Sequence, residues 1–248
     1  MIELVSLMLG SANLSRFVLF PYDMYGAQKA IIRKNFAFYN NLSASDKRIF
    51  EHRVIRFIEA HNFSGREGVV ITKKMEILIA ATAVMLTFGM RRYMFPKFKN
   101  IVIYPKNYIS KVTKRRHKGE TNPRAGTIVF SWDNFLSGVE VDDDNLNLGL
   151  HELTHALHFN FLMDGSFTAA VFLDKFKALL ERMKDKKLQQ KIVKSGYLRD
   201  YAYTNKFEFL SVLVEHFFET PYEFQEKLPE VYEMVKDMLN IDLLKMSA

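Results

Sequence analysis

The sequence predicts an α+β fold, with a mainly helical body beside a small β-sheet, and three observations lead to this class. Apolar residues recur with helical spacing in the first third and in the C-terminal half of the chain. Two short runs between these parts, 101–104 and 127–130, are rich in β-branched and aromatic residues, as strands are. A further helical pattern begins near residue 146, so we expect a helix directly after the last strand.

The predicted helices follow from apolar stripes. From Ser45 to His61 the stripe consists of Ile49, Phe50, Val54, Phe57 and Ile58. Similar patterns predict helices at 167–184, 205–219 and 229–244.

Two segments are apolar enough to raise the question of a membrane. Residues 75–90 are apolar apart from Glu76, Thr82, Thr87 and Gly89. A span needs about 20 residues, so this shorter stretch with an internal acid predicts a buried helix. Residues 4–20 are interrupted by polar residues and leave a peripheral anchor open, and no membrane span is expected.

Composition narrows the setting of the protein. The chain has 248 residues, 48% of them hydrophobic, and can bury a full core. Cysteine is absent, which excludes disulfides and thiolate metal ligands and fits a reducing compartment. The segment from Met1 to Leu9 has an acid before its apolar residues and no basic leader, so the expected location is cytoplasmic.

The segment His151-Glu152-Leu153-Thr154-His155 carries the clearest chemistry. One helical turn rises about 5.4 Å, so imidazoles four positions apart share one side of a helix and can bind one zinc ion. Glu152 lies roughly 100° further round, where its carboxylate can act as general base on a bound water. Residues 142–145, three Asp and one Asn, favour a helix start before it. The alternative is two ordinary histidines on an amphipathic helix.

A catalytic zinc commonly takes three protein ligands, so a third should follow downstream. Glu208 is the best candidate. Asn205 and Glu208 also fit a capping box, in which the carboxylate satisfies the helix's own amide, and spacing alone does not separate these readings. Glu215, about two turns later on the same face, is a second candidate.

Further motifs occur in a definite order. They are Ile79-Ala80-Ala81-x-Ala83, Ile101-Val-Ile-Tyr-Pro105, Thr127-Ile-Val-Phe-Ser-Trp132, Asn145-x5-His151-Glu-x-x-His155, Tyr201-Ala-x-Thr204-x3-Glu208 and Glu215-x-Phe-Phe-Glu-x-Pro221. Together they resemble the Mlc titration factor A family of zinc peptidases, which is similar to the metalloprotease domain of anthrax lethal factor. The resemblance covers roughly residues 75–232.

The resemblance implies a zincin-like fold and a specific site. His151, His155 and Glu208 would bind one zinc ion, Glu152 would be the catalytic carboxylate and Tyr201 the active-site tyrosine that donates to the oxyanion. From its residue type alone, Tyr201 reads as an ordinary half-buried tyrosine. Residues 96–248 would form the metallopeptidase domain and 1–95 a mainly helical part packed on it, or both would form one compact unit.

The chain departs from the family pattern at three positions. Leu153 and Thr154 occupy the middle of the motif, and His158 stands where Asp is common. These changes leave the zinc ligands intact but affect substrate preference and hydrogen bonds around the site. His158 either lines the cleft or packs as an ordinary histidine.

Two functions follow as expectations. The first is a zinc metallopeptidase that hydrolyses peptide or protein substrates, with cleavage internal or from the amino end. The second is a regulatory protein that sequesters a transcriptional repressor and so controls sugar phosphotransferase uptake, as the family resemblance implies.

Two further expectations concern surfaces. In zincins an edge strand beside the metal helix pairs with the substrate backbone, and 127–132 is the candidate, unless this strand is internal and Ile128 and Phe130 are core. The net charge is +7, and residues 111–118 concentrate basic side chains. That run is expected to be a solvated loop or a docking site for an acidic partner. Nucleic acid is not expected as a partner, because neither interleaved aromatic residues nor a recognition-helix pattern accompanies the basic run.

Overall fold

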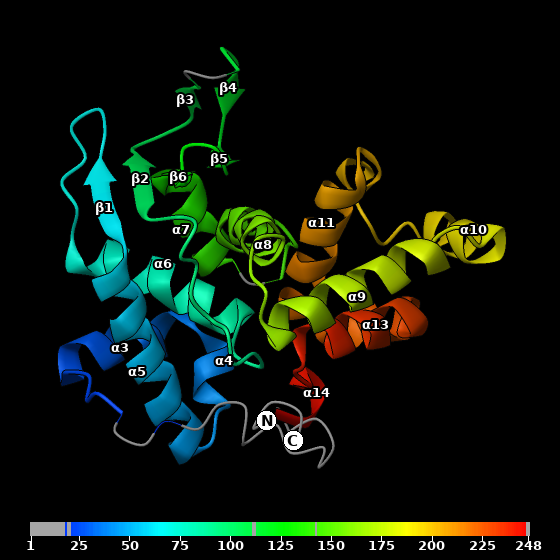
Figure 1. Cartoon of the computed structure of the whole chain (residues 1–248), viewed down its shortest axis with the longest axis horizontal. Helices are drawn as coiled ribbons and strands as arrows, with labels where there is room; N and C mark the ends of the chain where they lie inside the picture. The colour runs from blue at the N-terminus through cyan, green and yellow to red at the C-terminus, as the bar shows by residue number, and fades with distance from the viewer. Residues whose placement is uncertain (1–17, 19–20, 111–112, 142, 247–248) are drawn as a thin grey trace.

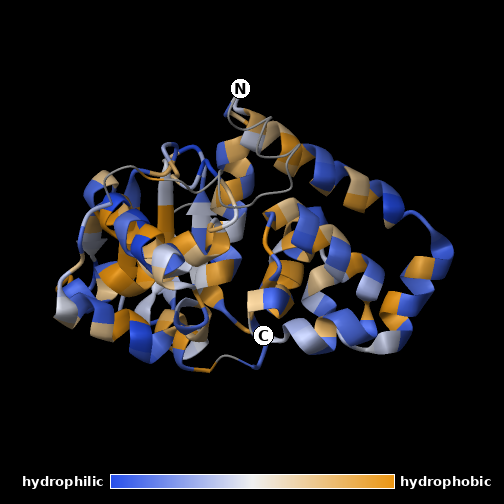
Figure 2. Ribbon diagram, turned by 90° about the horizontal axis from the view of Figure 1, so that it is seen from below, coloured by the Kyte–Doolittle hydropathy of each residue, from blue (hydrophilic) through white to orange (hydrophobic). Residues whose placement is uncertain are grey.

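The computed structural model describes residue 18 and residues 21–110, 113–141 and 143–246. The expectations for the segment from Met1 to Leu9 and for the apolar stretch 4–20 therefore lie almost wholly outside the described residues. The fold is α+β, as expected: a mainly helical body lies beside a small mixed sheet (Figure 1). Most helices carry a hydrophobic and a hydrophilic side (Figure 2), which is the amphipathic pattern read from the sequence.

The N-terminal part consists of α3 (Gly26–Asn35), α4 (Ala37–Asn40), α5 (Ala44–Ala60) and α6 (Lys73–Leu86). α3 and α5 pack on α6. From Met75 to Leu86 every residue of α6 but Glu76 is buried, which confirms the expected buried helix. No helix in the described ranges combines the length and the hydrophobicity that crossing a bilayer requires.

The sheet has the order β1-β2-β6-β5. Its strands are β1 (Asn62–Gly65), β2 (Asn100–Tyr104), β5 (Gly119–Asn122) and β6 (Thr127–Ser131). β1, β2 and β6 are parallel, whereas β5 is antiparallel to β6. A separate antiparallel pair consists of β3 (Tyr108–Ile109) and β4 (Arg116–His117).

The edge-strand hypothesis for 127–132 is wrong. β6 pairs with β2 on one side and with β5 on the other, so it is internal. Ile128 and Phe130 are fully buried, as the alternative reading expected. The edge strand that lies against the helix of the histidines is β5.

That helix is α8 (Leu148–Phe161), and it begins differently from the expectation. Residue 132 already opens another helix, α7 (Trp132–Glu140), so α8 does not follow the last strand directly. The N-cap is Asn147, whose side chain accepts a hydrogen bond from the Leu150 amide at 2.9 Å. α8 packs on α6, and a single hydrophobic core includes residues before and after position 95.

The C-terminal half is helical. It consists of α9 (Phe167–Arg182), α10 (Lys186–Ser195), the 3-10 helix η1 (Asp200–Tyr203), α11 (Lys206–Glu219), α12 (Pro221–Lys227), α13 (Pro229–Leu239) and α14 (Leu243–Met246). The helix expected at 229–244 ends early because Asn240 adopts a left-handed conformation with φ 53°. α11 packs directly on α8 and thereby brings residues near 208 to the histidines.

Candidate metal centre

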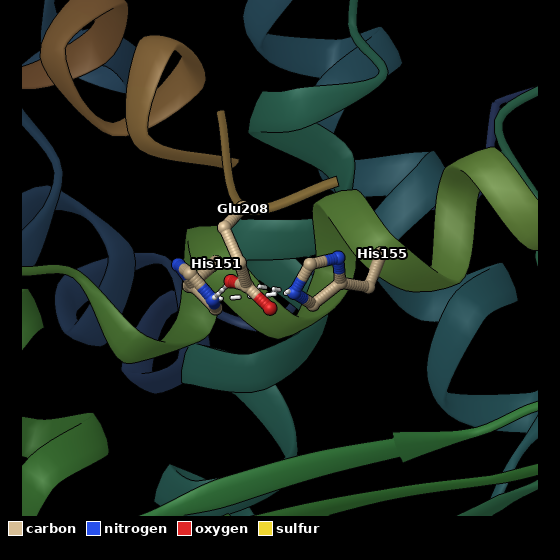
Figure 3. Close-up of side chains that lie close together, drawn as sticks. All are labelled: His151, His155 and Glu208. Carbon is tan, nitrogen blue, oxygen red and sulfur yellow. Dashed lines mark hydrogen bonds and ion pairs between the residues drawn. The ribbon is translucent and has the colours of Figure 1, made fainter. Parts of the chain in front are cut away.

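The two histidines of the motif and the downstream glutamate converge (Figure 3). His151 and His155 lie one turn apart on α8, and Glu208 lies in the first turn of α11. Glu208 Oε2 is 2.9 Å from His151 Nε2 and 3.3 Å from His155 Nε2. The two Nε2 atoms are 3.2 Å apart. All three side chains are largely buried, so the fold places three potential ligand atoms in one small volume.

This triangle fits a metal ion that prefers tetrahedral coordination. Ligand atoms at bond lengths of about 2.0–2.1 Å from zinc lie about 3.3 Å from one another. The three observed separations are close to that value. Two imidazoles and one carboxylate are also a donor set that zinc accepts, and they leave one position for water.

Glu208 is not used to cap its own helix. The side chain of Asn205 caps α11 alone, accepting hydrogen bonds from the amides of Phe207 at 2.8 Å and Glu208 at 3.1 Å. The Glu208 carboxylate instead faces the two histidines. The spacing left open whether Glu208 caps α11 or lies with the histidines. In the structure it lies with the histidines.

Glu215 lies behind the group and contacts His151 from the other side. Its Oε1 is 2.8 Å from His151 Nδ1, and its Oε2 accepts the Asn147 amide at 2.9 Å. Arg199 donates to the same Oε1 at 2.7 Å. Glu215 is therefore outside the convergent triangle, and it orients His151 so that Nε2 points at Glu208 and His155.

The charges around His151 favour a cation at this position. Burial favours the neutral ring, but hydrogen bonds to Glu208 and Glu215 outweigh it and raise the pKa of His151 to about 10. Burial would likewise raise the pKa of Glu208, yet the two histidines outweigh it and hold this pKa well below its usual range. The same negative field that stabilises a proton here stabilises a divalent ion.

Glu152 contacts the edge strand β5 and lies near His151, His155 and Glu208, whose charges act on it. Thr121 Oγ1 on β5 lies 2.9 Å from both the main-chain oxygen and Oε2 of Glu152. Gly119, on the same face of β5, lies so close that a Cβ there would be 2.7 Å from Glu152 Cγ. Burial raises the pKa of Glu152, although His151 and His155 oppose the rise. A carboxyl group with a raised pKa can accept and hold a proton nearer to neutral pH.

Tyr201 lies at the rim of the site. It belongs to η1, its side chain is half exposed, and its ring centroid is 5.8 Å from that of His151. Burial and the nearby Glu208 carboxylate raise its pKa to about 12. The phenol therefore keeps its proton at neutral pH and can donate it in a hydrogen bond.

Three supporting residues had not been singled out in the sequence. Ser211 on α11 lies 3.4 Å from His155 Nδ1, and Arg199 and Thr121 hold Glu215 and Glu152. Only Ser211 had a signal, since it lies three positions after Glu208 and thus on the same face of α11.

His158 packs in the interior. It is buried among the rings of Phe159, Phe176 and Phe207. Burial lowers its pKa to about 4. The sequence left open whether His158 lines the cleft or packs in the interior. In the structure it packs in the interior.

Two histidines on α8 and a glutamate on α11, which packs against it, lie beside a small mixed sheet. This is the arrangement of a metal-dependent hydrolase. Residues 18–239 match the glucose-regulated metallopeptidase family M90, and the chain belongs to this family. This confirms the resemblance to the Mlc titration factor A family. The chain is also 24% identical over 233 residues to an uncharacterized protein of Synechocystis sp. (strain ATCC 27184 / PCC 6803 / Kazusa), covering 84% of this chain and 81% of that protein.

Proposed function

We propose that this metallopeptidase is a zinc enzyme that hydrolyses peptide bonds, with His151, His155 and Glu208 as the zinc ligands. The observation that carries the proposal is the triangle of ligand atoms, 2.9 to 3.3 Å on each side, formed by groups from two helices. The absence of cysteine restricts the ligands to nitrogen and oxygen, which agrees with this set.

The residues around the triangle supply the remaining chemistry. Zinc, when bound, lowers the pKa of water and polarises the substrate carbonyl. Glu152 accepts a proton from the attacking water and later gives it to the leaving amine as the C–N bond breaks. Tyr201 donates its phenolic hydrogen to the carbonyl oxygen as negative charge develops there. Glu215 and Ser211 keep the two rings oriented.

The edge strand β5 is suited to bind the substrate backbone. Lys118 O accepts the Ser131 amide at 2.8 Å, so positions 118 and 131 form a hydrogen-bonded pair. Because such pairs alternate, Gly119 and Thr121 direct their main-chain groups to the other edge, where no described strand pairs with β5. These two residues also flank Glu152. A peptide added along β5 therefore passes the catalytic carboxylate.

Glu152→Gln separates catalysis from metal binding. The variant should keep its zinc, measured by atomic spectroscopy, and lose about 10²- to 10⁴-fold in kcat on quenched fluorescent peptides, because the amide cannot accept the proton. Glu226→Gln, an exposed change on α12, is the matched control and should behave as wild type.

A second variant tests the third ligand. Glu208→Ala should lose most of its zinc, because two imidazoles alone hold the ion weakly. Wild-type hydrolysis by Glu152→Gln, or full zinc occupancy in Glu208→Ala at limiting zinc, would contradict the proposal.

A second candidate function is binding and sequestering a transcriptional repressor, with hydrolysis secondary, as the family resemblance implies. The family's description as glucose-regulated agrees with a role in the response to sugar. The same variant distinguishes the two. A regulatory effect that persists in Glu152→Gln would show that binding carries it, whereas its loss would assign it to hydrolysis.

A further inference from the structure

The net positive charge of the chain is concentrated in one hairpin. We call residues 106–110 and 113–118, which include β3 and β4, the basic hairpin. They contain five Lys or Arg residues and no acid. The remainder of the chain contains 30 basic and 28 acidic residues, so five of the seven net charges lie here. The charge is therefore a local property rather than a general one.

The basic hairpin leads directly into the edge strand of the site. Lys118 immediately precedes Gly119, the residue against Glu152. Figure 1 shows β3 and β4 next to β5, and β4 directly precedes β5 in the chain. Tyr108 on β3 is buried and stacks on Tyr104 with ring centroids 4.3 Å apart. Burial raises the pKa of Tyr108, and the charges of Glu120 and Glu152 add to the rise, so the base of the hairpin lies close to the catalytic carboxylate.

The charges of the hairpin are accessible and not neutralised. The side chains of Lys106, Lys114, Arg115, Arg116 and Lys118 are all exposed. Among the residues that the structure describes, none of these five is in an ion pair. A solvated loop would be equally exposed, but it would not need to carry most of the net charge or to adjoin the site.

We propose that the basic hairpin selects peptides that carry Asp or Glu on the C-terminal side of the bond to be cleaved. This rests on the proposed peptidase function and on backbone pairing with β5. A peptide antiparallel to β5 runs from Asn122 towards Gly119, so the residues after the bond near Glu152 extend to the hairpin. Acidic side chains there meet unpaired cations, which favours their capture and orientation.

A peptide fits this surface better than a nucleic acid does. Glu152 lies near the base of the hairpin, and a continuous phosphate backbone that passes it would bring like charges together. A peptide needs negative charge only beyond the cleaved bond. An edge strand also offers main-chain groups that pair with a peptide and not with a nucleic acid.

The test compares quenched fluorescent peptides of one sequence in three versions, with Asp at two positions after the cleaved bond, with Asp at two positions before it, and with Asn throughout. Wild type should prefer the first over the Asn version by about tenfold in kcat/KM at low salt, because several exposed ion pairs act together. The preference should fall towards unity in about 0.5 M NaCl, because salt at that concentration strongly screens the attraction between exposed charges.

Variants then locate the effect. Lys114→Gln/Arg115→Gln/Arg116→Gln should abolish the preference while zinc content and thermal stability stay as in wild type. Lys186→Gln/Lys187→Gln/Lys191→Gln removes the same charge from the exposed face of α10, away from β4 in Figure 1, and should keep the preference.

The outcomes separate this inference from the proposed function. If wild type cleaves all three peptides equally, or if both triple variants lose the preference equally, the inference is wrong while the peptidase function stands. If no peptide is cleaved, the peptidase function fails, and binding of the Asp peptide to Glu152→Gln by fluorescence anisotropy still tests the hairpin. Tighter binding of a duplex DNA oligomer than of the Asp peptide at equal salt would overturn the inference.

Discussion

Glu215 shows how much of the candidate site depends on residues that do not face its centre. It accepts from His151 Nδ1, which orients the ring so that Nε2 points at Glu208 and His155. It also receives Arg199 and the Asn147 amide, so its charge is compensated inside the protein. One buried carboxylate thus fixes a ring, a helix start and an arginine.

Glu215→Gln should weaken zinc binding by about 10- to 100-fold, the usual cost of removing a partner behind a metal-bound histidine. The amide keeps the shape of the side chain but loses the charge that polarises the ring and pairs with Arg199. Competition with a chelator of known affinity measures the change. Glu223→Gln, exposed on α12, is the control, and equal zinc affinity in both variants would show that Glu215 does not position His151.

The spacing of residues in the sequence was sufficient to place two of the three convergent residues. His151 and His155 share a helical face by periodicity alone. Glu208 could be assigned to the site only through the family resemblance, because its spacing fitted a helix cap equally well. Thr121 and Arg199 could not be found, because each acts across a contact between segments that are far apart in sequence.

At the scale of elements, helices were easier to predict than strand order. The stripes at 45–61 and 167–184 correspond to α5 and α9 within two residues at each end. β5 has the sequence Gly-Glu-Thr-Asn, which contains almost no strand-forming residues, and only pairing with β6 makes it a strand. Its position explains why β6, with the stronger pattern, was mistaken for the edge. Strand order depends on long-range packing that local patterns do not encode.

Proline substitutions test this strand order. Val129 is paired with Val102 on one side and Glu120 on the other, so Val129→Pro should remove a ladder hydrogen bond inside the sheet. Leaving its acceptor unpaired should cost about 1–3 kcal/mol of stability. Thr121→Pro, whose amide faces the free edge of β5, should lower the thermal unfolding midpoint less. A larger loss for Thr121→Pro would mean that β6, not β5, is the edge.

At the scale of the whole molecule, the interior holds an acid that works against stability. Both carboxylate oxygens of Glu219 are buried without a hydrogen-bond partner of good geometry in the described part of the chain. Burial, with Glu215 and Asp144 nearby, raises the pKa of Glu219 to about 8, although Asn147 opposes the rise. In the unfolded chain its pKa returns to about 4.3. The free energy of unfolding should therefore fall as pH rises from about 4.3 to about 8.

Glu219→Gln removes this penalty because its side chain does not ionise. The variant should match wild type near pH 4 and exceed its unfolding midpoint by roughly 5 °C at pH 8, measured by circular dichroism. The gain should level off above pH 8, where the folded protein is ionised too. A constant difference across this range would show that the carboxyl group is not protonated in the fold.

Arg199 joins two parts of the molecule that the chain places far apart. It donates to the main-chain oxygen of Asn145, just before α8, and to Glu215 on α11, and it directly precedes the turn that carries Tyr201. The phenol is thus anchored to the same scaffold as the histidines before any substrate arrives. Little reorganisation is then left for each turnover, and the donor stands ready as charge develops.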